Sequence, residues 1–303
     1  MTNSILVTGA SGFIGSWVCK KLIGRNVVAA VSPFSNPTRL TGLDKDLTVV
    51  KVDLANSKEV EILFKKYKPK FIIHLATHGV YQYQQKDIER IIVDNYLMTA
   101  NLLSFSVKYG VTKFINTGSV FEYGSQNKKV KEEDVSLGDI INEYSAIKIA
   151  TTALTNSYSV KLDVITLRPF TTYGPFEDET RFVAATINRA LKNEEIKLVK
   201  GVVRDFVYVE DVANAFVKAL KVDFKSGEIV NIACGQKQTL ESTASLIRKI
   251  TNSKSKIIVD PKYKRSKESA CWADITKAKI ILKWQPEYDF ETGLRKSVDF
   301  LKK

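Results

Sequence analysis

The glycine-rich turn near the N-terminus constrains the fold of this chain more than any other stretch. The apolar run Ile5–Val7 predicts a strand, and apolar residues from Trp17 onward recur at helical spacing. Between them, Gly9, Gly12 and Gly15 stand three residues apart. A strand that turns in this way into a helix aims backbone N–H groups and the positive end of the helix dipole at one point. Because glycine allows the turn geometry, close approach of phosphates and tight helix packing, the turn predicts a pyrophosphate site for a dinucleotide.

Composition excludes several classes of protein. The 303 residues are 44% hydrophobic and 26% charged, which is typical of a soluble globular protein with a sizeable core. No apolar run reaches the roughly 18 residues of a membrane span, and no signal peptide precedes the first strand, so we expect a cytoplasmic protein. Cys19, Cys234 and Cys271 are scattered and odd in number, as expected for reduced thiols. Neither histidine has a metal-ligand partner nearby, so we expect no metal site.

The net charge of +13 has two interpretations. One is an anionic partner: nucleic acid, an anionic membrane surface or a phosphorylated substrate. The other is a surface that lysine keeps soluble. The lysines are spread along the chain, mostly as helix-face pairs such as Lys20–Lys21 and Lys65–Lys66, which favours the second interpretation. We expect neither nucleic acid nor a membrane as a partner.

Strands alternate with helices along the first half of the chain. Runs typical of buried strands recur at Val27–Val31, Val49–Leu54, Phe71–Ala76, Lys113–Ser119 and Val164–Phe170. This alternation predicts the α/β class, with a Rossmann-type doubly wound parallel sheet. After residue 170 the pattern changes. We assign residues 1–170 to a dinucleotide-binding domain and residues 171–303 mainly to a smaller C-terminal substrate-binding part, interleaved with the sheet.

The end of the second predicted strand bears on the choice of cofactor. In this architecture it meets the adenosine ribose, where a carboxylate selects NAD and a basic residue accommodates the 2′-phosphate of NADP. The strand is followed by Ser32, residues 33–39 include no carboxylate, and Arg39 is available. We therefore expect Ser32 and Arg39 to contact NADP, with NAD as the alternative cofactor. The other interpretation of Arg39 is a solvated loop residue.

A serine, a tyrosine and a lysine occur in an order that predicts proton transfer. Ser119 ends the fifth predicted strand, two residues after the Thr117 hydroxyl. Tyr144 and Lys148 lie one turn apart on one face of a helix predicted over Asn142–Tyr158. A tyrosine with a pKa near 10 is a poor acid or base at neutral pH. A neighbouring lysine ammonium, together with the positive nicotinamide of an oxidised cofactor, lowers that pKa by favouring phenolate. Ser119 can hold the same substrate oxygen.

Further side chains stand at the carboxyl ends of the predicted strands. Ala76 and Thr77 end the fourth strand, where small residues let a flat cofactor lie across the sheet. His78 follows near the site, and Asn95, in the next helix, faces the end of the sheet. His74, within the strand, is more typical of a hydrogen-bonded core histidine than of a catalyst.

Together these motifs resemble the extended short-chain dehydrogenase/reductases, in particular the nucleotide-sugar epimerase, dehydratase and reductase group. The resemblance runs from Thr8 to Trp284, nearly the whole chain. It implies a catalytic triad of Ser119, Tyr144 and Lys148, of which the last two also contact the cofactor. Besides Tyr144 and Lys148, the predicted cofactor-binding residues are Gly9, Ser11, Gly12, Phe13, Ile14, Gly15, Ser32, Arg39, Asp53, Leu54, Leu75, Ala76, Thr77, Asn95, Thr117, Pro169 and Phe170.

The same resemblance implies contacts to a substrate. Arg204, in a stretch similar to the family's Arg-Asp-Phe/Tyr-Ile/Val-His-Val segment, would bind a sugar-nucleotide diphosphate, which needs charge-assisted donors. Its structural alternative is an ion pair with an acid such as Asp205. Thr171 stands where the group usually has asparagine, which puts one substrate contact in doubt. The predicted substrate-binding residues are His78, Ser119, Glu122, Thr171, Arg204 and Arg265.

Departures from the family pattern narrow the expected reaction. Sugar 4,6-dehydratases resemble one another in an Asp-Glu pair directly after the catalytic serine position, where this chain has Val120 and Phe121. The missing acid at Ser32 argues against tightly held NAD. We therefore expect an NADPH-dependent reductase of the C4 keto group of an NDP-4-keto-6-deoxyhexose. The alternative is an NAD-dependent NDP-sugar 4-epimerase, followed by a flavonoid-type NADPH ketone reductase and a catalytically silent NADP-sensing protein.

Two long predicted helices bear on assembly. The helices expected over Ile91–Tyr109 and Asn142–Tyr158 resemble those of the family's four-helix dimer interface. We expect a homodimer whose small-molecule partner is a nucleotide-diphosphate sugar.

Overall fold

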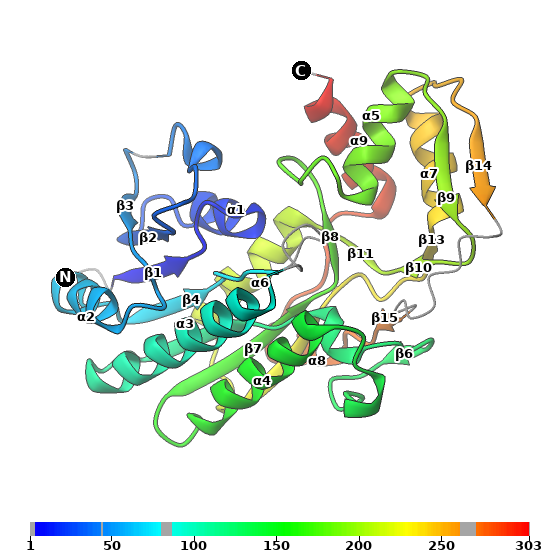
Figure 1. The fold of residues 1–303 in the computed structure, drawn as a ribbon. Coiled ribbons are helices and arrows are strands. Elements are labelled where there is room, and N and C mark those ends of the chain that lie inside the picture. Colours follow the sequence, from blue (N-terminus) through cyan, green and yellow to red (C-terminus); the bar gives the residue numbers. More distant parts are fainter. Residues whose placement is uncertain (1–3, 44, 80–86, 261–270, 303) are drawn as a thin grey trace.

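The fold is built on a parallel sheet, as the computed structural model shows for residues 4–43, 45–79, 87–260 and 271–302. Its strands are β1 (Ile5–Thr8), β2 (Val27–Val31), β3 (Thr48–Lys51), β4 (Phe71–His74), β5 (Lys113–Thr117), β7 (Asp163–Pro169) and β12 (Glu228–Ile232). They lie in the order β12-β7-β5-β4-β1-β2-β3, and every neighbouring pair is parallel (Figure 1). The strand order reverses between β1 and β4, where a doubly wound sheet opens a crevice at its carboxyl ends. The predicted Rossmann-type fold class is confirmed.

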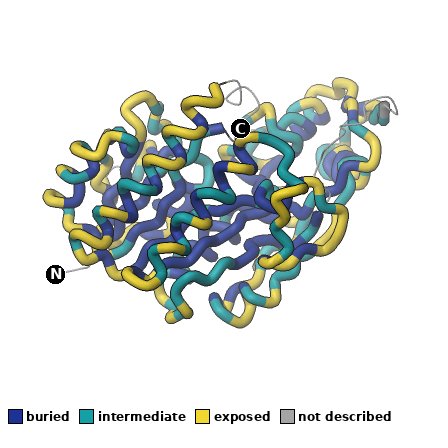
Figure 2. The backbone as a smooth tube through the Cα atoms, turned by 60° about the horizontal axis from the view of Figure 1, so that its bottom comes forward, coloured by how far each residue is buried: buried dark blue, intermediate teal, exposed yellow. Residues whose placement is uncertain are grey.

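Helices cover both faces of this sheet, which is why its central strands β1, β2 and β4 are almost entirely apolar. One face carries α1 (Phe13–Lys21) and α6 (Val209–Lys221), and the other carries α2 (Ser57–Tyr67), α3 (Ile88–Lys108) and α4 (Glu143–Ser157). Alternate strand residues enter the two cores: Val7 packs with α1 and α6, and Leu6 packs with α2 and α3. Figure 2 shows the strands as a buried layer enclosed by more exposed segments.

The chain after residue 170 builds a smaller layer beside the carboxyl ends of the sheet (Figure 1). Its elements are β8 (Thr171–Tyr173), α5 (Phe182–Leu191), β9 (Ile196–Val199), β10 (Val203–Arg204), β11 (Phe206–Tyr208), β13 (Gln238–Thr239), α7 (Leu240–Ile250), β14 (Ile257–Asp260) and α9 (Phe290–Leu301). Aromatic rings fill its core, with Phe206 stacked on Phe290 at 5.3 Å between ring centroids. The short strands β6 (Lys129–Val130) and β15 (Trp272–Ala273) pair nearby.

This C-terminal part is interleaved with the sheet, because the chain leaves it and returns. α6 packs on α1, β12 adds the edge strand beside β7, and α8 (Thr276–Ile281) contacts β12. A division at residue 170 therefore separates strands of one sheet, and the two-part domain assignment stays a prediction.

Asp205 ties the smaller layer together. It lies between β10 and β11 with 1% of its surface exposed. Its carboxylate accepts backbone N–H groups of Cys234, Gly235 and Ala273 at 3.0, 2.9 and 3.0 Å. Two segments distant in sequence, the loop at Cys234–Gly235 and strand β15, thus depend on one acceptor, and buried N–H groups without an acceptor are costly.

Replacing Asp205 with asparagine is expected to lower the free energy of unfolding by about 2–4 kcal/mol. The amide NH2 would face N–H groups that the carboxylate now accepts. Urea unfolding followed by circular dichroism measures the change. Asp223→Asn is the control, because the Asp223 side chain is fully exposed and its change is expected to stay within about 0.5 kcal/mol. Equal midpoints for the two variants would show that Asp205 does not hold these segments.

Candidate active site

The glycine turn between β1 and α1 closes against the start of the neighbouring loop after β4. Gly9 has a φ of +64°, and a Cβ there would lie 2.6 Å from the backbone nitrogen of Ala76. A Cβ on Gly15 would lie 2.1 Å from the Gly9 carbonyl oxygen. Gly12 precedes the first residue of α1, and among the described residues no side chain caps that helix start. The backbone there is accessible to an anion, as the sequence predicts.

A single cavity of about 2450 Å³ extends from this turn across the carboxyl ends of the sheet to α5 and β9. It exceeds the roughly 300–1,000 Å³ of an ordinary small-molecule site, so it has room for two large ligands. Most residues expected from the sequence line it: Gly9, Ser11, Gly12, Phe13, Ile14, Gly15, Ser32, Arg39, Asp53, Leu54, Leu75, Ala76, Thr77, His78, Thr117, Ser119, Tyr144, Lys148, Pro169, Phe170, Thr171 and Arg204.

Tyr144 and Lys148 enter the cavity from the first turns of α4, where Asn142 caps the helix by accepting the Ser145 N–H. Tyr144 is 4% exposed, and side-chain hydrogen bonds join its phenol to Thr77 and Ser119. Serine, tyrosine and lysine thus meet at the carboxyl end of the sheet, on the same cavity as the glycine turn. This geometry suits proton transfer to or from a substrate oxygen.

Burial governs the protonation of the tyrosine and the lysine. Burial raises the pKa of Tyr144 to about 12 and lowers the pKa of Lys148 to about 8. The ammonium of Lys148 donates to the Thr117 carbonyl at 2.6 Å. Desolvation thus outweighs the groups that lower the pKa of this phenol, and the expectation that Lys148 together with an oxidised nicotinamide favours phenolate stays a prediction. The phenol is a proton donor here, and only the hydrogen bonds and cations around it oppose the effect of burial.

Asn95 supports the site from behind. Its Oδ1 accepts the Thr77 hydroxyl and the His78 backbone N–H, each at 2.9 Å, and its Nδ2 donates to the His78 carbonyl at 2.9 Å. It fixes the turn after β4 and does not line the cavity. His78 lines the cavity, and burial lowers its pKa. His74 is a core histidine as predicted, held by Thr8 at 2.8 Å and Thr99 at 3.0 Å.

Arg39 is more than a solvated loop residue, because its guanidinium is hydrogen-bonded to two backbone carbonyls. Its Nε donates to the Phe176 carbonyl at 3.0 Å, and one Nη donates to the Ser11 carbonyl at 3.4 Å. The guanidinium thus joins the glycine turn to a segment 137 residues away. Ser32 is exposed at the end of β2 and accepts the Phe34 N–H. Because two of its five N–H donors are directed to backbone carbonyls, Arg39 offers weaker support for a 2′-phosphate than the sequence suggests.

The far end of the cavity carries cations that sequence reasoning missed. Arg204 lies there with Arg181, Arg189 and Lys197. The last three are on or beside α5 and β9, whose patterns in sequence are those of ordinary amphipathic elements, so no local signal marked them. Arg204 donates to the Val203 carbonyl at 2.8 Å. Arg265, the other expected diphosphate ligand, lies outside the described residues.

Glu122 is placed differently from its predicted role. It is 1% exposed and is not among the residues that line the cavity. One carboxylate oxygen accepts the Ser119 N–H at 2.7 Å, and the other pairs with Arg168 at 2.8 Å. The expectation that Glu122 contacts the substrate is wrong, because the carboxylate is turned inward to an arginine 46 residues further along the chain.

The described residues also bear on metals and membranes. In ranges 4–43, 45–79, 87–260 and 271–302, no group of three histidine, cysteine or acidic side chains is placed to hold a metal ion, and no disulfide forms. No helix in these ranges combines the length and apolar character needed to cross a membrane.

Known proteins match the chain over nearly its whole length. UDP-glucuronate 4-epimerase from Thermodesulfobacterium geofontis is 27% identical, with 98% of this chain and 95% of the relative covered. The structure of UDP-glucose 4-epimerase from Thermotoga maritima, solved with UDP-glucose, superposes with a TM-score of 0.87 at 29% identity, covering 99% and 98% of the two chains. That of UDP-glucuronic acid 4-epimerase from Bacillus cereus, in complex with UDP-glucuronic acid and NAD, gives 0.88 at 25% identity, covering 99% of both.

The model of one family describes most of the chain. It matches residues 5–233, from the first strand of the sheet to the residue after β12. The match contains the glycine turn, the serine, tyrosine and lysine, and Arg204. On this match, the chain belongs to the NAD dependent epimerase/dehydratase family.

Proposed function

We propose that this protein is an NAD-dependent nucleotide-sugar 4-epimerase, the function that the sequence predicts as the alternative to a C4-ketoreductase. The observation that carries the proposal is that Ser119, Tyr144 and Lys148 line one cavity with the glycine turn. Relatives matched over the full length and named 4-epimerases support the reaction. The direction of Arg39 toward two carbonyls weakens the main argument for NADP.

The dinucleotide fits the residues present. The cradle at Gly9 and Gly15 leaves no room for a Cβ, and the start of α1 offers backbone N–H groups to a pyrophosphate. When bound, a nicotinamide dinucleotide supplies reversible hydride transfer at the sugar C4. Arg204, with Arg181, Arg189 and Lys197, would hold the diphosphate of the sugar nucleotide at the other end.

The protein's own residues carry the proton in this mechanism. Tyr144 takes the proton of the sugar C4 hydroxyl and later returns it to the same oxygen, while Ser119 holds that oxygen in line. The first step needs the phenolate. Hydrogen bonds from Thr77 and Ser119 and the charge of Arg181 lower the Tyr144 pKa against the effect of burial. Lys148 keeps a positive charge beneath the reacting groups.

The residues after Ser119 argue against dehydration. Val120 is apolar, and the Phe121 ring packs edge-on against Tyr144 with 5.7 Å between centroids. Removing a sugar hydroxyl requires an acid and a base beside the neighbouring carbons. These two positions supply neither.

A C4-ketoreductase that consumes NADPH is the second candidate. It rests on residues 32–39, which contain no carboxylate to accept the hydroxyls of an NAD ribose. Both reactions use the same three side chains, so the distinction lies in the cofactor and in whether it leaves after turnover.

The test measures the cofactor and the reaction together. The purified protein is heat-denatured and the released dinucleotide is identified by mass spectrometry. Native protein is then incubated with UDP-glucose or UDP-glucuronic acid without added cofactor. We expect retained NAD and formation of the C4 epimer of one sugar. NADPH consumption with a 4-keto sugar, and no epimer from either substrate, would replace this proposal with the reductase.

Assembly and location remain proposals of the same kind. Ile92, Tyr96 and Leu97 on α3 are 50%, 39% and 42% exposed, an unusual number of large apolar side chains for a helix facing water. We propose that α3 and α4 pair with the same helices of a second copy in a homodimer. A cytoplasmic location agrees with the reduced thiols expected from the sequence.

A further inference from the structure

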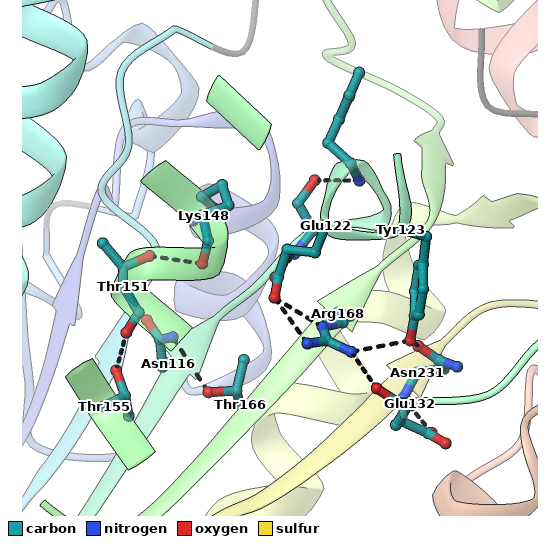
Figure 3. A network of polar contacts seen from close by, with 12 residues as sticks. Asn116, Glu122, Tyr123, Glu132, Lys148, Thr151, Thr155, Thr166, Arg168 and Asn231 are labelled. Atoms are coloured by element: carbon teal, nitrogen blue, oxygen red, sulfur yellow. Dashed lines mark hydrogen bonds and ion pairs between the residues drawn. The ribbon is translucent and has the colours of Figure 1, made fainter. Parts of the chain in front are cut away.

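A buried ion pair adjoins Ser119 through its backbone N–H. Figure 3 shows the two side chains of the pair, Glu122 and Arg168. Glu122 and Arg168 have 0% and 3% of their side chains exposed and meet through two contacts, at 2.8 and 2.9 Å. The other Glu122 oxygen accepts the Ser119 N–H at 2.7 Å. Ser119 Oγ in turn accepts the Phe121 N–H at 3.2 Å, so serine and glutamate cap a single 3₁₀ turn reciprocally.

The remaining donors of Arg168 anchor this pair to the sheet. Arg168 lies on β7, and its Nη1 donates to the Tyr123 hydroxyl at 3.1 Å and to the Glu132 carbonyl at 2.8 Å. The Tyr123 hydroxyl donates to Asn231 on β12 at 2.6 Å. Figure 3 shows Glu122, the Tyr123 hydroxyl and Glu132 around the guanidinium, with Asn231 beyond Tyr123. These contacts hold the Glu122 carboxylate in one position, and that position fixes the backbone N–H of Ser119.

Gly118 makes the contact possible. A Cβ on Gly118 would lie 2.5 Å from the Glu122 carboxylate and 2.7 Å from the Arg168 side chain. The strand must pass over the ion pair without a side chain. Because apolar residues of similar volume generally serve a core at least as well as a buried ion pair, stability alone does not account for a charge here.

We propose that the Glu122–Arg168 pair is a positioning element of the active site: Glu122 fixes Ser119 through its backbone N–H, and its charge sets the proton balance of Lys148 and Tyr144. This inference rests on the proposed function only in taking those three side chains as catalytic, which both candidate reactions share. Glu122 itself touches neither substrate nor cofactor.

The electrostatics around Glu122 agree with this role. Its negative charge raises the pKa of Lys148 and so opposes the burial that brings it to about 8. The same charge raises the pKa of Tyr144, while Arg181 lowers it. The charged and titratable groups facing the carboxylate from the packed elements are Arg168 on β7, Tyr144 and Lys148 on α4, and Tyr123 on its own turn.

Glu122→Gln tests the charge while keeping an acceptor for the Ser119 N–H. Without the charge, the pKa of Lys148 and the pKa of Tyr144 both fall. We expect both inflections of the kcat–pH profile to move to lower pH by about 0.5–1 unit, the size expected for one charge several ångströms away in a protein. KM is expected to change less than about twofold, because Glu122 is not on the cavity wall.

Glu132→Gln is the matched control. Glu132 is a second buried glutamate of the same network, and its carboxylate accepts the Asn231 N–H at 2.9 Å rather than that of Ser119. Its profile is expected to superpose on that of the unchanged protein. Superposition of the Glu122→Gln profile as well, with circular dichroism melting intact, would overturn the proposal.

A double variant and a spectroscopic titration test the proposal if Glu122→Gln does not fold or if no nucleotide sugar is turned over. If Glu122→Gln fails to fold because Arg168 loses its partner, the double variant Glu122→Gln with Arg168→Gln removes both charges. A smaller downward shift is then expected, because the loss of the Arg168 charge opposes part of the effect. If no nucleotide sugar is turned over, the proposed function fails. In that case, tyrosinate absorbance is titrated for the unchanged protein and for Glu122→Gln, each with and without Tyr144→Phe, so that the difference reports the pKa of Tyr144. If Glu122→Gln leaves that pKa unchanged, the proposed role of the charge is contradicted.

Discussion

Tyr144→Phe is expected to lower kcat by about 10³-fold or more while leaving dinucleotide affinity within about threefold of that of the unchanged protein. The substitution removes one hydroxyl and preserves the ring that packs on Phe121. That hydroxyl is the group placed to exchange a proton with the substrate oxygen. The cofactor depends instead on the glycine turn at the other end of the cavity.

Steady-state kinetics on whichever UDP sugar the protein epimerises measures kcat, and isothermal titration calorimetry of the apoprotein measures dinucleotide binding. Tyr109→Phe is the matched control. Its hydroxyl donates to Glu61 at 3.0 Å on the outer surface of α2 and α3, so kcat is expected to change less than twofold. Activity retained in Tyr144→Phe would remove the proposed mechanism.

Gly15→Ala is expected to abolish dinucleotide binding, with an affinity loss of at least about 100-fold. The added Cβ would lie 2.1 Å from the Gly9 carbonyl oxygen and 2.9 Å from its carbon, both backbone atoms that cannot rotate away. Helix α1 must therefore move off β1, and the turn that aims N–H groups at the pyrophosphate opens. Strain of this kind also costs about 1–3 kcal/mol of folding free energy.

The control for this change is Gly138→Ala. The nearest atom to a Cβ at Gly138 is the Ser136 hydroxyl oxygen at 3.7 Å, an ordinary contact. Binding and melting temperature are expected to stay near those of the unchanged protein. Calorimetric titration with NAD and a thermal melt measure both variants. Normal NAD affinity in Gly15→Ala would show that the turn does not hold the cofactor.

Local signals predicted the frame of the molecule well. The run Val27–Val31 is a strand with the bounds expected. The predicted strand Lys113–Ser119 ends earlier, at Thr117, because Ser119 caps a 3₁₀ turn over Val120–Tyr123 instead of continuing the ladder. A serine followed three residues later by a glutamate is a capping signal in its own right, and it would have identified Glu122 as structural.

The partners of charged side chains were not predictable in this way. Glu122 depends on Arg168, and Arg39 on the carbonyl of Phe176, which stands 137 residues away. Asp205, considered as a partner of Arg204, serves three backbone N–H groups instead. Each of these side chains has several chemically reasonable partners in sequence, and only packing selects one.

The sequence by itself determined the parallel sheet, the glycine turn and the spacing of Tyr144 and Lys148, because steric limits on the backbone and the periodicity of apolar residues act over a few residues at a time. Tertiary structure alone decided which way each buried charge points and how strongly its proton is held. Those properties depend on desolvation and on groups brought together from distant strands, and the local sequence predicts neither.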